Sequence, residues 1–165
     1  MKANHVPTKA DKKVKVVPVN ATEQARRIQQ AIARRAYQIF ERRGGAGWHE
    51  LEDWHKAESE ILLPSCCGQM KSNGKLWIGT NASSFETGTI EIWVAPRRLT
   101  FCGNPSVGKI HAPFKESRPE MVYRVVDLPL EVETEGVVAR FHGPSLELVL
   151  RQAQPKPASA MAAAV

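Results

Sequence analysis

The hydrophobic residues of this chain recur at three- and four-residue steps near its beginning and at every second position further on. Between positions 21 and 43 the steps of three and four are made by Ile28, Ile32, Ala36, Ile39 and Phe40. Residues at this spacing fall on one face of a helix. The pattern therefore predicts an amphipathic helix over residues 21–43.

This predicted helix has recognisable start and stop signals. Asn20 followed by Glu23 resembles a capping box, and Thr22 is an alternative cap. Gly44 and Gly45 end the pattern, because glycine readily adopts the left-handed conformation that closes a helix.

A second helix is predicted from about residue 48 to residue 63, with an apolar stripe of Leu51, Trp54, Ala57 and Ile61. Pro64 ends it, because proline lacks the amide donor that a continuing helix needs. Arginines dominate the first helix, and carboxylates dominate the second. We therefore expect a helical hairpin in which the basic helix faces the acidic one.

From about residue 75 the apolar residues alternate with polar ones in short runs, which glycine, proline and asparagine turns separate. The predicted fold is mainly β: an antiparallel immunoglobulin-like β-sandwich preceded by an α-helical hairpin. The segments expected are a flexible basic arm (1–20), a two-helix domain (21–63), a linker (64–74), the sandwich (75–151) and a disordered tail (152–165).

Two blocks of sequence carry a family resemblance. The first is N-A-S-S-F-E-T-G-T-I-E-I-W-V-A-P-R-R-L-T-F-C-G, at residues 81–103. The second combines M-V-Y-R-V-V-D-L-P with A-R-F-H-G-P-S-L-E-L-V-L. Both resemble the alpha-crystallin domain of small heat-shock proteins. The resemblance implies an alpha-crystallin-type sandwich and a chaperone that holds unfolding proteins without ATP.

Departures from the family's pattern bear on assembly. Pro144 and Ser145 stand where the family's closing strand has Gly-Val, and the tail lacks the I-x-I or I-x-V tripeptide that docks on another subunit. The loop between positions 103 and 120 carries Pro105, Pro113 and Pro119, and prolines remove donors from a strand ladder. These departures argue against strand exchange and large assemblies. We expect self-association into a dimer or small oligomer.

The helical segment carries a second resemblance. Its residues follow the pattern R-A-Y-x-x-F-E-x-R-G at residues 35–44, and then L-E-D-W-x-x-A-E at residues 51–58. This pattern resembles a short bacterial domain of unknown function. The resemblance implies a bacterial source and lends no activity.

A client groove is predicted between two strands of the sandwich, because an extended segment can add to an open sheet edge. The residues expected to line it are Ile90, Ile92, Val94, Leu146, Leu148 and Leu150. Ordinary core packing is the alternative for most of them.

Two residues are candidates for a dimer interface. Arg124 occupies the position of the family's strand arginine, which implies an interface and acidic partners; the alternative is an edge arginine whose head reaches water. Trp93 alternates with the apolar face and is expected at the surface. The other three tryptophans are expected in the core.

The chain shows no pattern of catalytic or metal-binding residues. Its histidines and cysteines lack the spacing of a zinc site, and no nucleophile with a base, nor a phosphate-binding glycine loop, is apparent. Cys66 and Cys67 are adjacent, so inert thiols are expected, and a redox or transient metal-binding role is the alternative. We expect no enzyme activity, no cofactor and no bound metal.

The net charge of +6 comes from the front of the chain, where lysines and arginines can contact a nucleic-acid backbone. The acidic second helix can neutralise the arginines, which makes nucleic-acid binding a minor alternative. No apolar run can cross a bilayer, and the first residues lack the apolar centre of a signal peptide. A cytoplasmic protein without a membrane partner is expected.

The predicted function is that of an ATP-independent holdase, resembling small heat-shock proteins, which binds unfolding client proteins. Two alternatives stay open. One is a protein-interaction module without chaperone activity on the same sandwich. The other is a nucleic-acid-associated protein that acts through the basic front segment.

Overall fold

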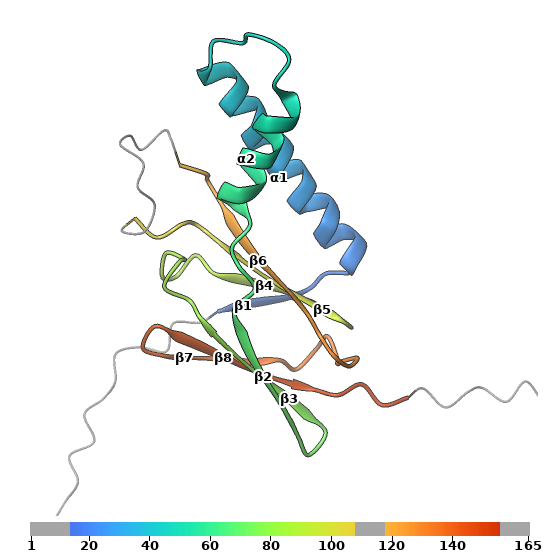
Figure 1. Ribbon diagram of the computed structural model, residues 1–165. Coiled ribbons are helices and arrows are strands. Elements are labelled where there is room, and N and C mark those ends of the chain that lie inside the picture. The colour runs from blue at the N-terminus through green and yellow to red at the C-terminus, as the bar shows by residue number, and fades with distance from the viewer. Residues whose placement is uncertain (1–13, 108–117, 156–165) are drawn as a thin grey trace, which may run out of the picture.

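A computed structural model describes residues 14–107 and 118–155, which form two four-stranded sheets and two helices (Figure 1). Sheet A has the order β1 (Lys15–Pro18), β4 (Glu91–Ala95), β5 (Arg98–Gly103), β6 (Val122–Asp127). Sheet B has the order β2 (Cys67–Ser72), β3 (Lys75–Asn81), β8 (Ser145–Arg151), β7 (Val138–His142). The helices are α1 (Ala21–Arg42) and α2 (Glu50–Ile61).

The two sheets pack face to face because their strands alternate between inward and outward residues. On β3 and β8 every second residue is buried, starting at Leu76 and Leu146. These side chains meet apolar residues of sheet A, of which Phe101 is the largest, in one core. Strand pairs are antiparallel except for β1 with β4. The predicted mainly β sandwich with helices before it is therefore confirmed.

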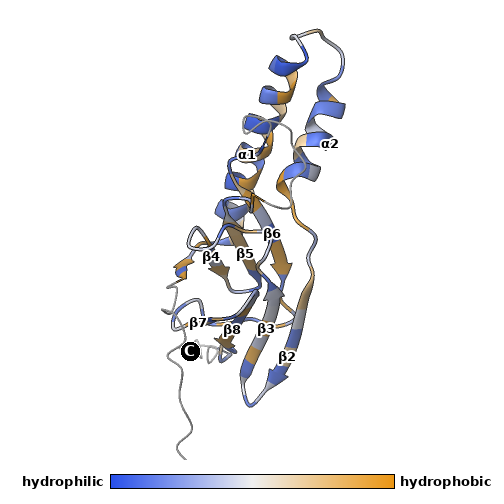
Figure 2. Cartoon of the chain, turned by 90° about the vertical axis from the view of Figure 1, so that its left-hand side faces the viewer, coloured by the Kyte–Doolittle hydropathy of each residue, from blue (hydrophilic) through white to orange (hydrophobic). Residues whose placement is uncertain are grey.

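The helical hairpin covers the outward face of sheet A. The Asn20 side chain accepts a hydrogen bond from the backbone N–H of Glu23 at 2.8 Å, which confirms the predicted cap. Ile28 and Ile32 of α1 belong to a second apolar cluster, to which sheet A contributes residues such as Tyr123. The far end of the hairpin stands clear of the sheets, where α1 and α2 pack mainly on each other (Figure 2).

The basic helix faces the acidic one, as predicted. The Arg35 guanidinium lies 2.6 Å from a carboxylate oxygen of Glu60, and the guanidinium of Arg43 lies 2.5 Å from a carboxylate oxygen of Asp53. Two residues of the predicted second helix are nevertheless at the surface. Trp48 is 93% exposed and Leu51 69%, because α2 is short and its first turn lies beyond the sheet. The core position predicted for Trp48 was therefore wrong, and Leu51 of the predicted apolar stripe is left uncovered.

Two segments predicted to lack structure contain strands. Residues 15–18, placed in the flexible arm, form β1, because the open edge of β4 supplies partners for their backbone groups. The predicted linker contains β2, which pairs with β3 through a tight turn at Asn73-Gly74, where both residues have positive φ. An Asn-Gly pair is a hairpin signal, so this strand was readable from the sequence.

Other predicted features lie outside the described residues. They are the remainder of the arm at residues 1–13, the part of the proline-containing loop at residues 108–117 where strand exchange would occur, and the tail at residues 156–165.

Candidate protein-binding surfaces

The six residues predicted to line a client groove lie in the core of the sandwich instead. Ile90, Ile92, Val94, Leu146, Leu148 and Leu150 are between 0 and 6% exposed. They come from facing sheets and point at one another, so the structure contradicts a client groove at these positions. Ordinary core packing, the alternative for most of them, holds for all six.

The edge of β4 is closed by the chain's own β1. Val16 pairs with Ile92 and Pro18 with Val94 in the ladder, and the backbone N–H of Val19 donates to the Val94 carbonyl at 3.0 Å. The side chain of Val16 packs against the sandwich core. An added strand of the kind that a client was predicted to supply is therefore supplied at this edge by β1 of the same chain.

The edge of β6 is also in contact with the chain itself. Leu62 forms a parallel bridge with Tyr123, and the backbone N–H of Leu63 donates to the Tyr123 carbonyl at 2.7 Å. These two leucines follow directly after α2, so the helical hairpin brings them to the edge. Both edges of the three-stranded unit β4–β5–β6 are therefore occupied, at least in part, by segments of the same chain.

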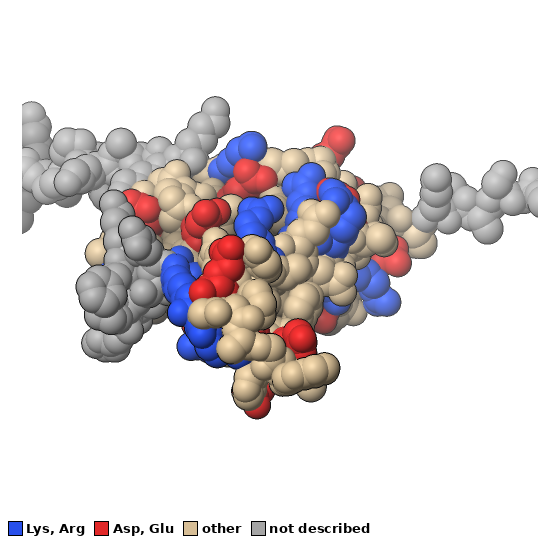
Figure 3. Space-filling model, turned by 90° about the horizontal axis from the view of Figure 1, so that it is seen from above, with Lys and Arg blue, Asp and Glu red and all other residues tan. Residues whose placement is uncertain are grey.

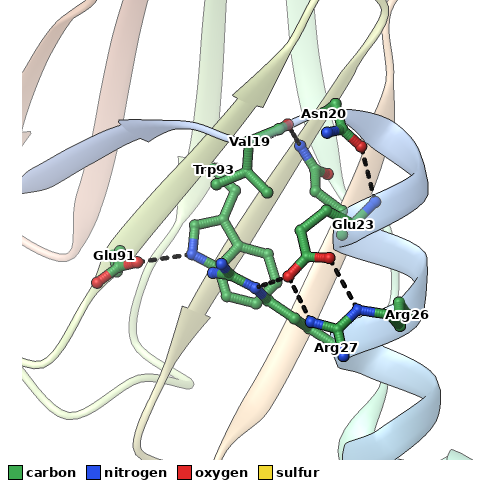
Figure 4. Close-up of polar contacts among 8 residues, drawn as sticks. Val19, Asn20, Glu23, Arg26, Arg27, Glu91 and Trp93 are labelled. Carbon is green, nitrogen blue, oxygen red and sulfur yellow. Dashed lines mark hydrogen bonds and ion pairs between the residues drawn. The ribbon is translucent and has the colours of Figure 1, made fainter.

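Trp93 is buried, contrary to its predicted exposure. It is 5% exposed, lies on the outward face of sheet A and is covered by α1 (Figure 4). Its indole N–H donates to the Glu91 carboxylate at 2.7 Å, and the guanidinium carbon of Arg27 lies 5.1 Å from the ring centroid. A surface role for this residue in a dimer is therefore contradicted by the fold of the single chain.

A carboxylate on α1 holds two arginines beside this tryptophan. Glu23 binds Arg26 at 2.7 Å and Arg27 at 2.8 Å (Figure 4). Hydrogen bonds from Arg26 and then from Arg27 lower the pKa of the Glu23 carboxyl to about 2. Partial burial would raise the pKa of Glu91, but hydrogen bonds from Lys15 and Trp93 outweigh burial and leave the pKa of this carboxyl lowered. Both carboxylates therefore stay charged and fix the neighbouring cations.

Arg124 points into the sandwich and ties its two sheets together. Its side chain donates to the Pro64 carbonyl at 3.0 Å, the Thr80 hydroxyl at 2.9 Å and the Asn81 carbonyl at 2.7 Å. The guanidinium carbon also lies 5.5 Å from the Phe85 ring centroid. The predicted acidic partners are wrong within the described part of the chain, and so is the water-exposed alternative, because the residue is 5% exposed.

Sheet B presents the open surface of the described structure. Its outer strands are β2 and β7, and every residue of β2 after Cys67 is exposed. Outward residues on β3 and β8 include Trp77 and Val149, which are only partly buried. Unpaired strand edges and partly exposed apolar side chains both favour contacts with other proteins.

The three cysteines differ in accessibility. Cys66 is exposed, Cys67 is half-buried and Cys102 is buried. Burial, followed by the nearby Glu91 carboxylate, raises the pKa of the Cys102 thiol to about 12, which makes this thiol unreactive. In the described ranges, no cluster of three or more histidine, cysteine or acidic side chains suits a metal ion.

The basic residues of α1 do not form one positive field. Seen from the helical end, lysines and arginines alternate with acidic residues (Figure 3). Four of the arginines on or beside α1 are paired with Glu23, Asp53 or Glu60. A surface of this kind is a weak ligand for phosphate backbones, which need unneutralised cations.

The comparison with protein families agrees with the resemblance of the helical segment. Residues 27–62 match the family model described as "Protein of unknown function (DUF2934)". No curated protein matches the chain. Neither helix in the described ranges has the length and apolar character needed to cross a membrane.

Similar solved structures include small heat-shock proteins at low identity. Heat shock protein 16.0 from Schizosaccharomyces pombe has a TM-score of 0.45 and 13% identity, over 62% of this chain and 84% of that one. HSP18.5 from E. histolytica has a TM-score of 0.42 and 13% identity, over 56% of this chain and 91% of that one. A small heat-shock protein from Xylella fastidiosa has a TM-score of 0.40 and 15% identity, over 56% of this chain and 89% of that one.

One buried polar residue escaped the sequence reasoning. Gln24 of α1 donates from its side-chain amide to the Val19 carbonyl at 2.8 Å and accepts from the Thr100 hydroxyl at 2.7 Å. It therefore joins the end of β1, the first turn of α1 and the middle of β5. Its position one residue after Glu23 in an apparently polar first turn gave no signal of burial.

Proposed function

We propose that this protein is an ATP-independent holdase of the bacterial cytoplasm, which binds unfolding proteins and limits their aggregation. The open edge of β2 is the observation that carries the proposal. β2 is an outer strand, it is exposed along almost its whole length, and it belongs to the sandwich whose motifs resemble small heat-shock proteins. An extended client segment can add to such an edge through backbone hydrogen bonds.

The closure of sheet A supports a second candidate, a module that binds one defined partner and is not a chaperone. β1 occupies the edge of β4, and Leu62 and Leu63 contact the edge of β6, so binding surfaces concentrate on sheet B. A restricted surface suits a defined partner better than a broad set of clients. The two candidates predict different outcomes in the same experiment.

The decisive experiment is thermal aggregation of a heat-labile client, followed by light scattering without ATP, with the full chain added up to an equimolar ratio. The holdase proposal predicts suppression of scattering for several unrelated clients. A folded protein that suppresses none of them would overturn it and leave the interaction module as the better candidate.

Proline variants at neighbouring positions of β2 test the edge itself. Along an antiparallel edge, successive N–H groups point alternately to the partner strand and to solvent. Of Gln69→Pro and Met70→Pro, we expect one to lower the melting temperature and the other to leave it nearly unchanged. The variant that keeps its melting temperature has lost an outward donor and should hold clients less well. Full suppression by that variant would exclude strand addition at β2.

A further inference from the structure

A row of apolar side chains crosses the outward face of sheet B. The strand register places Met70 beside Trp77, Trp77 beside Val149, and Val149 beside Val138. Met70 is 62% exposed and Val138 44%, at the two ends of the row. An apolar row that spans four strands and is open to solvent differs from scattered surface residues, and such patches mark interaction sites.

The two sides of this apolar row carry different groups. On one side, Lys75 of β3 lies beside Arg151 of β8. On the other side, Glu147 of β8 lies between Gly79 of β3 and Arg140 of β7, and its carboxylate lies 3.2 Å from the imidazole of His142. The glycine leaves a hollow against the Trp77 ring, which Met70 and Glu147 also line. A Cβ atom added at Gly79 would meet nothing within 4 Å, so the space is open.

We propose that this face binds a second copy of the chain, sheet against sheet, about a twofold axis that runs along the apolar row. Such a rotation exchanges the two sides of the row and leaves each strand opposite its own copy. It brings Arg151 opposite Glu147 of the second copy, and the reverse, which forms two ion pairs around an apolar centre. The hollow at Gly79 gives each Trp77 ring room to lean aside where the two rings meet.

The charge pattern selects this axis and this occupant. A twofold axis along the strands would place Lys75 opposite Arg151 of the other copy, and like charges there would repel. An isologous interface must be self-complementary, and Arg151 and Glu147, which lie on opposite sides of the row on one strand, supply that property. An unfolding client of arbitrary sequence does not require a self-complementary surface. The inference does not rest on the proposed holdase activity, because either can hold without the other.

Charge reversal tests the pairing in the full chain. The mass of the wild-type protein is measured by light scattering across a dilution series, together with Glu147→Arg, Arg151→Glu and the double variant. We expect a dimer for the wild type, monomers for each single variant at the same concentration, and a dimer again for the double variant. The two residues are separated by Val149 on β8, about 13 Å of strand, so rescue points to pairing between copies.

Three results would overturn the proposal: a wild-type monomer at the highest soluble concentration, single variants with wild-type mass, or a double variant that stays monomeric while folded. Circular dichroism and melting temperature establish folding in each case.

Gly79→Val provides a test that does not involve charge. Valine suits a strand, and the open space around Gly79 means that the single chain accommodates it. The hollow is then filled, and we expect dimer dissociation to become about tenfold easier or more. Gly47→Val, also in open space but in the loop of the helical hairpin, is the matched control and should keep the wild-type mass. If Gly79→Val abolishes client holding and the wild type is already a monomer, the face binds clients and the second-copy proposal is wrong.

Discussion

Arg27 of α1 lies over the indole ring of Trp93 of β4, with 5.1 Å between the guanidinium carbon and the ring centroid (Figure 4). The contact joins the helical hairpin to the sandwich. A cation over the face of a tryptophan is attractive, and the same ring also contacts Tyr123, with 5.8 Å between ring centroids. The hairpin is therefore part of the packing of sheet A.

Removing the Trp93 side chain should destabilise the whole molecule. We expect Trp93→Ala to lower the free energy of unfolding by about 3–5 kcal/mol, because it leaves a cavity between α1 and sheet A. Trp48→Ala is the control, because Trp48 is almost fully exposed, and it should stay within about 0.5 kcal/mol of the wild type. Chemical denaturation measures both. Equal effects of the two substitutions would contradict the docking of the hairpin.

Replacing Arg124 should weaken the fold without changing assembly. Arg124→Met leaves the Thr80 hydroxyl and two backbone carbonyls without their charged donor, and we expect a loss of about 2–4 kcal/mol in the free energy of unfolding. Arg98→Met is the matched control. It breaks only the more exposed ion pair with Asp127 and should cost less than about 1 kcal/mol.

The oligomeric state of Arg124→Met separates the structural role from an interface role. Since the side chain is satisfied inside its own chain, a variant that remains folded should keep the mass of the wild type. A folded Arg124→Met protein that dissociates would restore the interface role predicted from the family resemblance.

Detaching β1 should expose the edge of β4. Val16→Asp places a carboxylate against the sandwich core, and we expect β1 to leave the sheet at a cost of about 1–3 kcal/mol. Hydrogen exchange should then accelerate in peptides that cover β1 and β4, and leave β3 and β8 protected. Lys15→Ala removes only the exposed ion pair with Glu91 and serves as the control.

Client binding by Val16→Asp links β1 to the proposed function. If open edges hold clients, the variant should suppress aggregation at a lower molar ratio than the wild type. Unchanged exchange in β4 would show that β1 does not close this edge.

The reactivity and pH dependence of Cys102 follow from its burial. Its pKa is raised from 9.0 to about 12, so it should resist alkylation in the folded protein at mildly alkaline pH, while exposed Cys66 reacts. Mass spectrometry of the alkylated peptides distinguishes the two. Rapid modification of Cys102 without unfolding would contradict its position beneath α1.

The raised pKa of Cys102 also makes the stability of the fold depend on pH. The folded state favours the protonated thiol, so the contribution to stability is complete below pH 9.0, the ordinary thiol pKa. It is lost as the pH rises towards about 12. We expect Cys102→Ala to remove this part of the alkaline decline in melting temperature.

Local features were readable because neighbouring residues determine them. The cap at Asn20 depends on a residue three positions away, and the stripe of Ile28 and Ile32 depends on the helical period. Alternation along β8 likewise placed Leu146, Leu148 and Leu150 on one face. That face was predicted to line a groove, but its three leucines lie in the core. The prediction failed because alternation shows which side chains share a face and does not show what covers that face.

Sequence by itself determined the two helices, their opposite charges, most of the strands and the kind of sandwich that they form. Only the tertiary structure decided that α1 buries Trp93, that β1 closes the edge of β4, and that Arg124 binds neutral oxygens of its own chain. The physical reason is that periodicity and capping act over a few residues. Burial and edge closure instead depend on contacts between residues far apart in the chain, such as Val16 with Ile92 and Arg27 with Trp93.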